Sequence, residues 1–149
     1  MDGVDRELDL WNSLFHDGAI LKMQGRVPGD IQVIIEPGLG NRKYFQDPGE
    51  NFIVVMRNCS ACELDRDEGK GPEPVHDLGA VWDEPSLFWV YRKGDFLTFD
   101  CVIGYLRVKY EGSDVFLDSG SPVTFEELEQ SCRRWWDEWR AYLDKKRST

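Results

Sequence analysis

Residues 124–147 read TFEELEQSCRRWWDEWRAYLDKKR, and this stretch decides the class of fold. Thr124 is followed three residues later by Glu127, which is the spacing of a capping box at the start of a helix. Apolar side chains then recur at steps of three and four, at Phe125, Leu128, Cys132, Trp135, Trp139 and Tyr142, with Trp136 and Leu143 beside them. Acidic first turns and a basic last turn suit the helix dipole. The pattern predicts an amphipathic helix over residues 124–146, packed on the rest of the chain by its tryptophans.

The beginning of the chain predicts a second, shorter helix and a hairpin. Apolar residues fall at helical spacing over residues 5–15, and Gly18 is suited to end that helix in a left-handed conformation. Strands are expected over residues 19–26 and 31–36. Pro28-Gly29-Asp30 lies between them as a turn, so the two strands form a hairpin.

The middle of the chain predicts further strands. The continuous apolar run 52–56 is typical of a central strand with both faces covered. Other strands are expected over residues 75–82, 87–92, 96–110 and 115–118, with a bulge or bend at Gly104. The tight turns between them favour an antiparallel arrangement over parallel strands with helical crossovers.

Together these elements predict a single α+β domain over residues 1–149. We expect an antiparallel β-meander sheet of about six or seven strands, a short N-terminal helix and a long C-terminal amphipathic helix packed on the sheet. Residues 63–74 are charged and rich in glycine and proline, so they are predicted to form a mobile acidic loop.

The charge of the chain narrows the classes of partner. Its formal net charge is −10 and its isoelectric point is about 4.6. Such a surface repels nucleic acid and favours either solubility alone or steering toward a basic protein. No stretch is long and apolar enough for a transmembrane helix, and residues 1–7 lack the basic start and apolar segment of a secretory signal. We therefore expect a cytoplasmic location.

The cysteines raise the question of a metal or redox site. Cys59 and Cys62 form a CxxC pair, and Cys101 and Cys132 could complete a zinc site. However, Cys132 lies on the apolar stripe of the last helix, and Cys101 lies within a strand. The pattern favours four structural thiols over zinc or redox chemistry.

The remaining candidates for chemistry are weaker. His16-Asp17 and His76-Asp77 resemble pairs used by metal-dependent hydrolases, but the chain holds no third histidine. A calcium loop starting at Asp65 fails, because its sixth and twelfth positions hold Lys70 and His76. A metal-dependent hydrolase is thus the least favoured function. No catalytic residue, metal or cofactor is predicted.

Two parts of the chain carry a family resemblance. Residues 11–18 read WNSLFHDG and precede the expected strands, and TFEEL at 124–128 leads to WWDEW at 135–139. In these features the chain resembles small bacterial immunity-protein-like domains of polymorphic toxin systems. The resemblance implies a cytoplasmic antidote that binds a cognate toxin and blocks its active site or its assembly. It carries no catalytic residues to transfer.

These observations favour a non-catalytic binding protein of the immunity or inhibitor type, which neutralises a basic toxin by acidic surface complementarity. Adjacent side chains on a helix point about 100° apart, so one of Trp135 and Trp136 is expected to be partly open. The expected partner-binding residues are Glu63, Asp65, Asp67, Glu68, Glu73 and Trp136. The alternative is a β-domain that binds a small molecule or peptide in a pocket between the sheet and the C-terminal helix.

Overall fold

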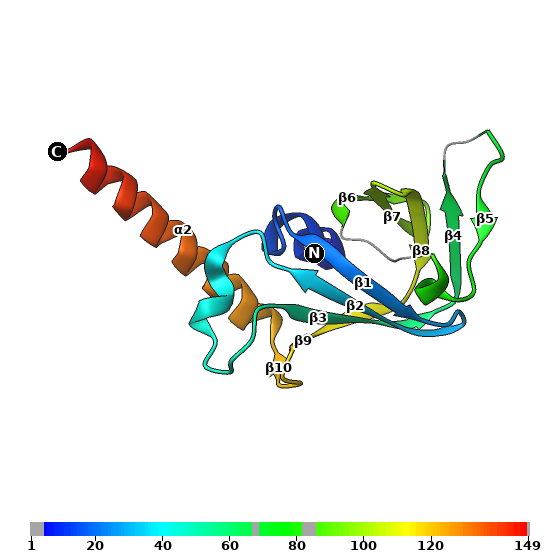
Figure 1. The fold of residues 1–149 in the computed structure, drawn as a ribbon, viewed down its shortest axis with the longest axis horizontal. Helices are drawn as coiled ribbons and strands as arrows, with labels where there is room; N and C mark the ends of the chain where they lie inside the picture. Colours follow the sequence, from blue (N-terminus) through cyan, green and yellow to red (C-terminus); the bar gives the residue numbers. More distant parts are fainter. Residues whose placement is uncertain (1–4, 67–68, 82–85, 149) are drawn as a thin grey trace.

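A computed structural model describes residues 5–66, 69–81 and 86–148, and it has the expected α+β architecture (Figure 1). The N-terminal helix α1 (Arg6–Asp9) continues into a π-helical turn η1 (Leu10–Leu14), and the C-terminal helix is α2 (Phe125–Arg147). Two short 3-10 helices, η2 (Gly40–Tyr44) and η3 (Leu78–Ala80), lie between strands. The strands are β1 (Ala19–Gly25), β2 (Gly29–Glu36), β3 (Phe52–Cys59), β4 (Ala61–Asp65), β5 (Glu73–Pro74), β6 (Ser86–Lys93), β7 (Phe96–Cys101), β8 (Gly104–Lys109), β9 (Gly112–Leu117) and β10 (Pro122–Val123). Among the described residues, no helix has the length and apolar character needed to span a bilayer.

The sheet has ten strands in the described part of the chain, more than the six or seven predicted. Its order is β10-β9-β3-β2-β1-β6-β7-β8-β4-β5, and its neighbouring strands pair antiparallel. It contains two three-stranded meanders, β1–β3 and β6–β8, joined where β1 pairs briefly with β6.

The extra strands have identifiable origins. The stretch 96–110 is a hairpin rather than one bent strand, because Cys101 pairs with Gly104 across a tight turn. At Gly104 φ is +134°, and a Cβ there would lie 2.3 Å from the carbonyl oxygen of Asp65, so both backbone and space favour glycine. The predicted loop 63–74 begins in β4 and ends in β5.

Two continuous segments close the sheet around its core. Only Ser60 separates β3 from β4, and only Tyr110 and Glu111 separate β8 from β9. β9 pairs with β3 and β8 pairs with β4, and backbone hydrogen bonds bridge the junction from Ser60 to Lys109 and from Glu111 to Arg57. The segment β3–β4 therefore runs antiparallel to the segment β8–β9 along its whole length. This two-stranded ribbon bends sharply where β3 meets β4, and it links the two meanders (Figure 1).

Two strand predictions need correction. The strand expected over residues 75–82 is absent from its described part: Asp77 makes an isolated bridge with Arg26, and its side chain accepts a hydrogen bond from Gly79 to start η3. Trp82 lies outside the described residues. β3 does lie inside the sheet, between β2 and β9, but burial alternates along it and its second face is only partly covered.

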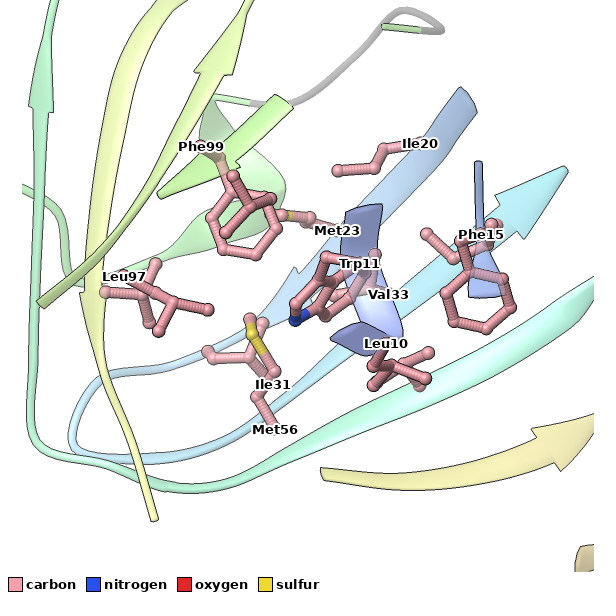
Figure 2. Packing of buried hydrophobic residues seen from close by; sticks show 14 of the residues in the cluster. Leu10, Trp11, Phe15, Ile20, Met23, Ile31, Val33, Met56, Leu97 and Phe99 are labelled. Carbon is pink, nitrogen blue, oxygen red and sulfur yellow. The ribbon is translucent and has the colours of Figure 1, made fainter. Parts of the chain in front are cut away.

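The core fills the space between the curved sheet and the N-terminal helical turns (Figure 2). Trp11 is 1% exposed and packs edge-on against Phe99, with ring centroids 5.0 Å apart. The ring centroids of Phe15 and Phe52 lie 5.6 Å apart. Aromatic pairs in tilted and edge-on geometry add to the stabilisation from burial. The apolar side chains that recur at helical spacing over residues 5–15 are thus the ones that pack against the inner face of the sheet.

Asn12 completes the hydrogen bonding of β6. The β1–β6 pairing covers Ala19–Ile20 against Ser86–Leu87, and no strand of the described residues pairs with the rest of that edge of β6. The amide of Asn12 donates to the carbonyl oxygen of Val90 at 2.6 Å and accepts from its N–H at 2.9 Å. One side chain therefore takes the place of a strand residue at the point where the two meanders meet.

α2 starts as the sequence predicts, with the full capping box of Thr124 and Glu127. Its first turns are anchored. Leu128 and Cys132 are buried, Asn41 of η2 donates to the Ser131 hydroxyl at 3.0 Å, and the Cys132 thiol donates to the carbonyl oxygen of Leu14 at 3.3 Å.

Beyond those turns α2 projects away from the body of the protein (Figure 1). Trp136, Trp139 and Tyr142 are 37%, 42% and 52% exposed, so the prediction that the tryptophans of this helix pack on the sheet is wrong for most of its length. The physical reason is that Trp11 and Phe15 already cover the inner face of the sheet, and α2 packs instead on η1 and η2. Trp135 is half-buried, with its indole close against Gly40.

Candidate partner-binding cleft

A hollow among the described residues lies between α1, the end of β3, β9 and the start of α2. It is an open cleft of about 660 Å³. Its walls are formed by Asp5, Arg6, Glu7, Leu10, Arg57, Glu111, Gly112, Ser113, Asp114, Val115, Phe116, Pro122, Val123, Thr124 and Phe125. Four of these side chains are carboxylates and two are guanidinium groups, so the lining is acidic overall.

The floor of the cleft is a hydrogen-bonded network centred on Glu7. Its Oε1 accepts from the Tyr110 hydroxyl at 2.7 Å and from the Ser113 hydroxyl at 2.5 Å. The indole N–H of Trp11 donates to the Tyr110 oxygen at 3.0 Å. Burial raises the pKa of Tyr110 well above its usual value, and the charge of Glu7 adds to this. The phenol therefore stays a neutral donor, and the carboxylate of Glu7 is held in one place by residues of the core.

The rim is fixed by ion pairs. Asp5 caps α1 by accepting from the N–H groups of Glu7 and Leu8, and Arg92 donates to Asp5 at 2.6 Å. That hydrogen bond from Arg92 holds the pKa of Asp5 below its ordinary value. On the opposite wall, Arg57 and Asp114 form an ion pair, with 3.0 Å between Nε and Oδ2.

Two other rim groups border the start of α2 and the β3–β9 junction. The Arg6 guanidinium lies over the ring of Phe125, 4.7 Å from its centroid. Glu111 accepts from the side-chain amide of Asn58 at 2.7 Å. The cleft thus offers fixed carboxylates next to an aromatic ring, an arrangement that suits a lysine or arginine side chain, since its stem can pack on the ring while its head meets carboxylate oxygens.

The residues predicted from the sequence to bind a partner do not share one surface. Glu63 and Asp65 lie on β4 and Glu73 on β5, whereas Trp136 lies on α2 at the opposite end of the molecule (Figure 1). Glu63 is already paired with Arg107 at 3.2 Å. The hairpin of β4 and β5, which corresponds to the predicted acidic loop 63–74, also carries Arg66 and Lys70, so its charge is mixed. Asp67 and Glu68 lie outside the described residues.

Sequence reasoning did not identify the cleft because its walls come from separate segments. Glu7 is expected on the first helix, and Glu111 and Asp114 lie in what the sequence presents as a simple turn. Nothing in either pattern indicates that they meet. The alternative prediction of a pocket between the sheet and the C-terminal helix named no residues, but the start of α2 does form one wall of the cleft.

The groups considered for metal chemistry are dispersed. In the described ranges, no three His, Cys, Asp or Glu side chains gather as metal ligands. His16 precedes β1 and contacts Asp17 at 3.3 Å, whereas the backbone of His76 pairs with Val27, just beyond the other end of β1. That strand holds them roughly 20 Å apart.

The four cysteines are buried free thiols, and burial raises the pKa of each, to about 12 for Cys62 and Cys101 and to about 11 for Cys132. A thiol with a raised pKa is a poor nucleophile at neutral pH. These side chains therefore act as small apolar groups of the core.

Comparison with known proteins found no matching family model, no matching curated protein and no matching solved structure.

Proposed function

We propose that this protein is a non-catalytic binding protein of the immunity or inhibitor type, and that its acidic cleft receives a basic segment of a protein partner. The observation that carries the proposal is the pre-positioned carboxylate of Glu7, fixed from below by Tyr110 and Ser113 and open to the cleft beside Asp114 and Glu111. The resemblance of residues 11–18 and 124–139 to immunity-protein-like domains supports a basic bacterial toxin as the class of partner.

The distribution of charge supports the same partner. Residues 133–148 carry six basic and three acidic side chains, a net charge of +3. Because the whole chain has a net charge of −10, the other residues carry −13. The body that contains the cleft is thus more acidic than the chain as a whole, and its field attracts a basic protein over a range of about 10 Å at moderate salt.

The cleft also supplies apolar surface next to its charged groups. Phe116 and Phe125 are partly buried and line it next to the carboxylates, so a bound arginine or lysine can lose water on its stem as well as pair its head. Such desolvated anchors contribute most of the affinity in protein interfaces, while exposed charges at the rim mainly raise the association rate.

Site-specific crosslinking in cells tests this function. A photoreactive phenylalanine analogue is placed at Phe116 in the cleft or, as a matched control, at Trp89, which is 59% exposed on the outer face of β6. We expect the Phe116 variant to capture one basic protein that the Trp89 variant does not capture. Capture of the same partner only from Trp89, or a partner that is acidic, would contradict the proposal.

A second function has one observation in its favour. The volume of the cleft is within the range of about 300–1,000 Å³ that is usual for small-molecule sites, and one wall is the start of α2. A peptide or small cation could therefore bind there without a folded partner. Calorimetric titration with a tri-arginine peptide distinguishes the two functions: saturable binding of the peptide alone favours this one, and heat only with the captured protein favours the inhibitor.

A further inference from the structure

The projecting part of α2, residues 136–148, is called the distal arm here. The last buried side chain of the helix is Cys132, and Trp135 is half-buried. Three large aromatic side chains of the arm, Trp136, Trp139 and Tyr142, are between 37% and 52% exposed. A run of exposed aromatic side chains on a projecting helix indicates a contact surface.

The arm has little support from the rest of the protein. A helical segment of about 13 residues is marginal in water by itself, because nucleation is costly. In the described part of the chain, the body contacts the arm near its start, where the Tyr44 hydroxyl donates to Glu138 and the His16 ring lies 6.4 Å from that of Trp136. Some support comes from within: the rings of Trp135 and Trp139 stack at 5.9 Å with planes 10° apart, and Trp139 stacks on Tyr142 at 5.5 Å. These contacts between residues three and four apart stabilise a helix only weakly. The arm is therefore stabilised by any partner that covers its aromatic face.

The order of charges along the arm identifies the partner. Asp137 and Glu138 come first, Arg140 and Asp144 lie in the middle among Trp139 and Tyr142, and Lys145, Lys146 and Arg147 come last. An antiparallel copy of the same segment places each basic end beside an acidic start and aromatic side chains in between. A parallel copy places like charges together. We propose that the distal arm pairs antiparallel with the distal arm of a second copy of this chain.

The available area sets the strength of this pairing. The body stands beside the arm at Trp135 and Gly40, so only the arms overlap, over about 20 Å of helix. Such an overlap buries roughly half of the ~800 Å² per partner that a standard stable interface buries. The dimer is therefore reversible and is symmetric about a two-fold axis near Ala141–Tyr142. It is independent of the cleft.

Analytical ultracentrifugation of the full chain tests the pairing over concentrations from about 10 μM to about 1 mM. We expect a monomer–dimer equilibrium that Trp139→Ala weakens by about tenfold or more. Trp89→Ala removes a tryptophan of β6 that is even more exposed than Trp139 and leaves the equilibrium unchanged. A chain that stays monomeric throughout, or an equal loss from Trp89→Ala, overturns the proposal.

Charge exchange tests the direction of pairing. The variant Lys145→Glu/Lys146→Glu makes both ends of the arm acidic, and Asp137→Lys/Glu138→Lys makes both basic. Each variant alone is expected to be monomeric where the unmodified chain dimerises, whereas their equimolar mixture recovers the dimer. Circular dichroism confirms that each variant keeps its helix, and a chain with all four substitutions should dimerise again. A mixture that does not associate, although both variants are folded, overturns the antiparallel arrangement.

Discussion

Glu7 and Tyr110 lie 103 residues apart in the sequence and are joined by a 2.7 Å hydrogen bond in the floor of the cleft. The tyrosine follows β8 and the glutamate lies in the first turn of α1, so this bond connects the strands around the core to the N-terminal helical turns inside them. The same oxygen of Tyr110 accepts from the core residue Trp11. The acidic site and the core are therefore parts of one network.

Removal of the Tyr110 hydroxyl should destabilise the protein. Tyr110→Phe leaves Glu7 without one donor and Trp11 without its acceptor, so the free energy of unfolding should fall by about 1–3 kcal/mol. Urea denaturation measures it. Tyr105→Phe removes a hydroxyl that makes no hydrogen bond within the described part of the chain, and it should cost less than about 0.5 kcal/mol. Equal effects of the two substitutions, or full additivity of Tyr110→Phe with Glu7→Gln, would show that the bond contributes nothing.

Asn12 should stabilise the junction of the two meanders. Asn12→Ala leaves both the N–H and the carbonyl of Val90 without their partner at a largely buried position, which should cost about 2–3 kcal/mol. Hydrogen exchange at the Val90 amide should quicken in the same variant. Ser13→Ala, next to it on the exposed side of the turn, is the matched control and should change neither quantity. An unaltered Val90 exchange rate would mean that the edge of β6 is protected by something else.

The buried thiols should make the fold sensitive to alkali. In the folded protein the pKa values of Cys62 and Cys101 are about 12, against an ordinary value of 9.0, because burial disfavours the thiolate. A raised pKa means that this contribution to stability is complete below pH 9 and is lost as the pH rises toward 12. The urea midpoint should therefore fall across that window. The Cys62→Ala/Cys101→Ala variant should show a shallower fall, and an equal slope in both proteins would count against the assignment.

The sequence predicts best those features that depend on neighbouring residues. The capping box at Thr124 and the hairpin of β1 and β2 were confirmed, because their signals are local. The exposure of Trp139 was not predictable from an amphipathic stripe, since periodicity shows which side chains share a face and not whether another element covers it. The partial exposure of Trp136 agrees with the expectation that one of Trp135 and Trp136 is open, because adjacent side chains on a helix point about 100° apart. Trp11 and Phe15 cover the inner face of the sheet, so the aromatic face of α2 does not pack there. The cleft was missed for a related reason: closure of the sheet brings Glu7 next to Ser113, and no spacing in the chain records this.

The salt dependence of association tests the central claim, that the acidic cleft attracts and receives a basic partner. The partner captured through Phe116 is mixed with the unmodified protein and with Glu111→Gln/Asp114→Asn, and the association rate constant is followed by stopped flow. We predict that the rate falls about tenfold or more from low to physiological salt, and that the cleft variant is slower at low salt. Glu73→Gln, on the hairpin at the other end of the sheet, should leave the rate unchanged. A rate that is insensitive to salt, or one that responds to Glu73→Gln and not to the cleft variant, would contradict the account.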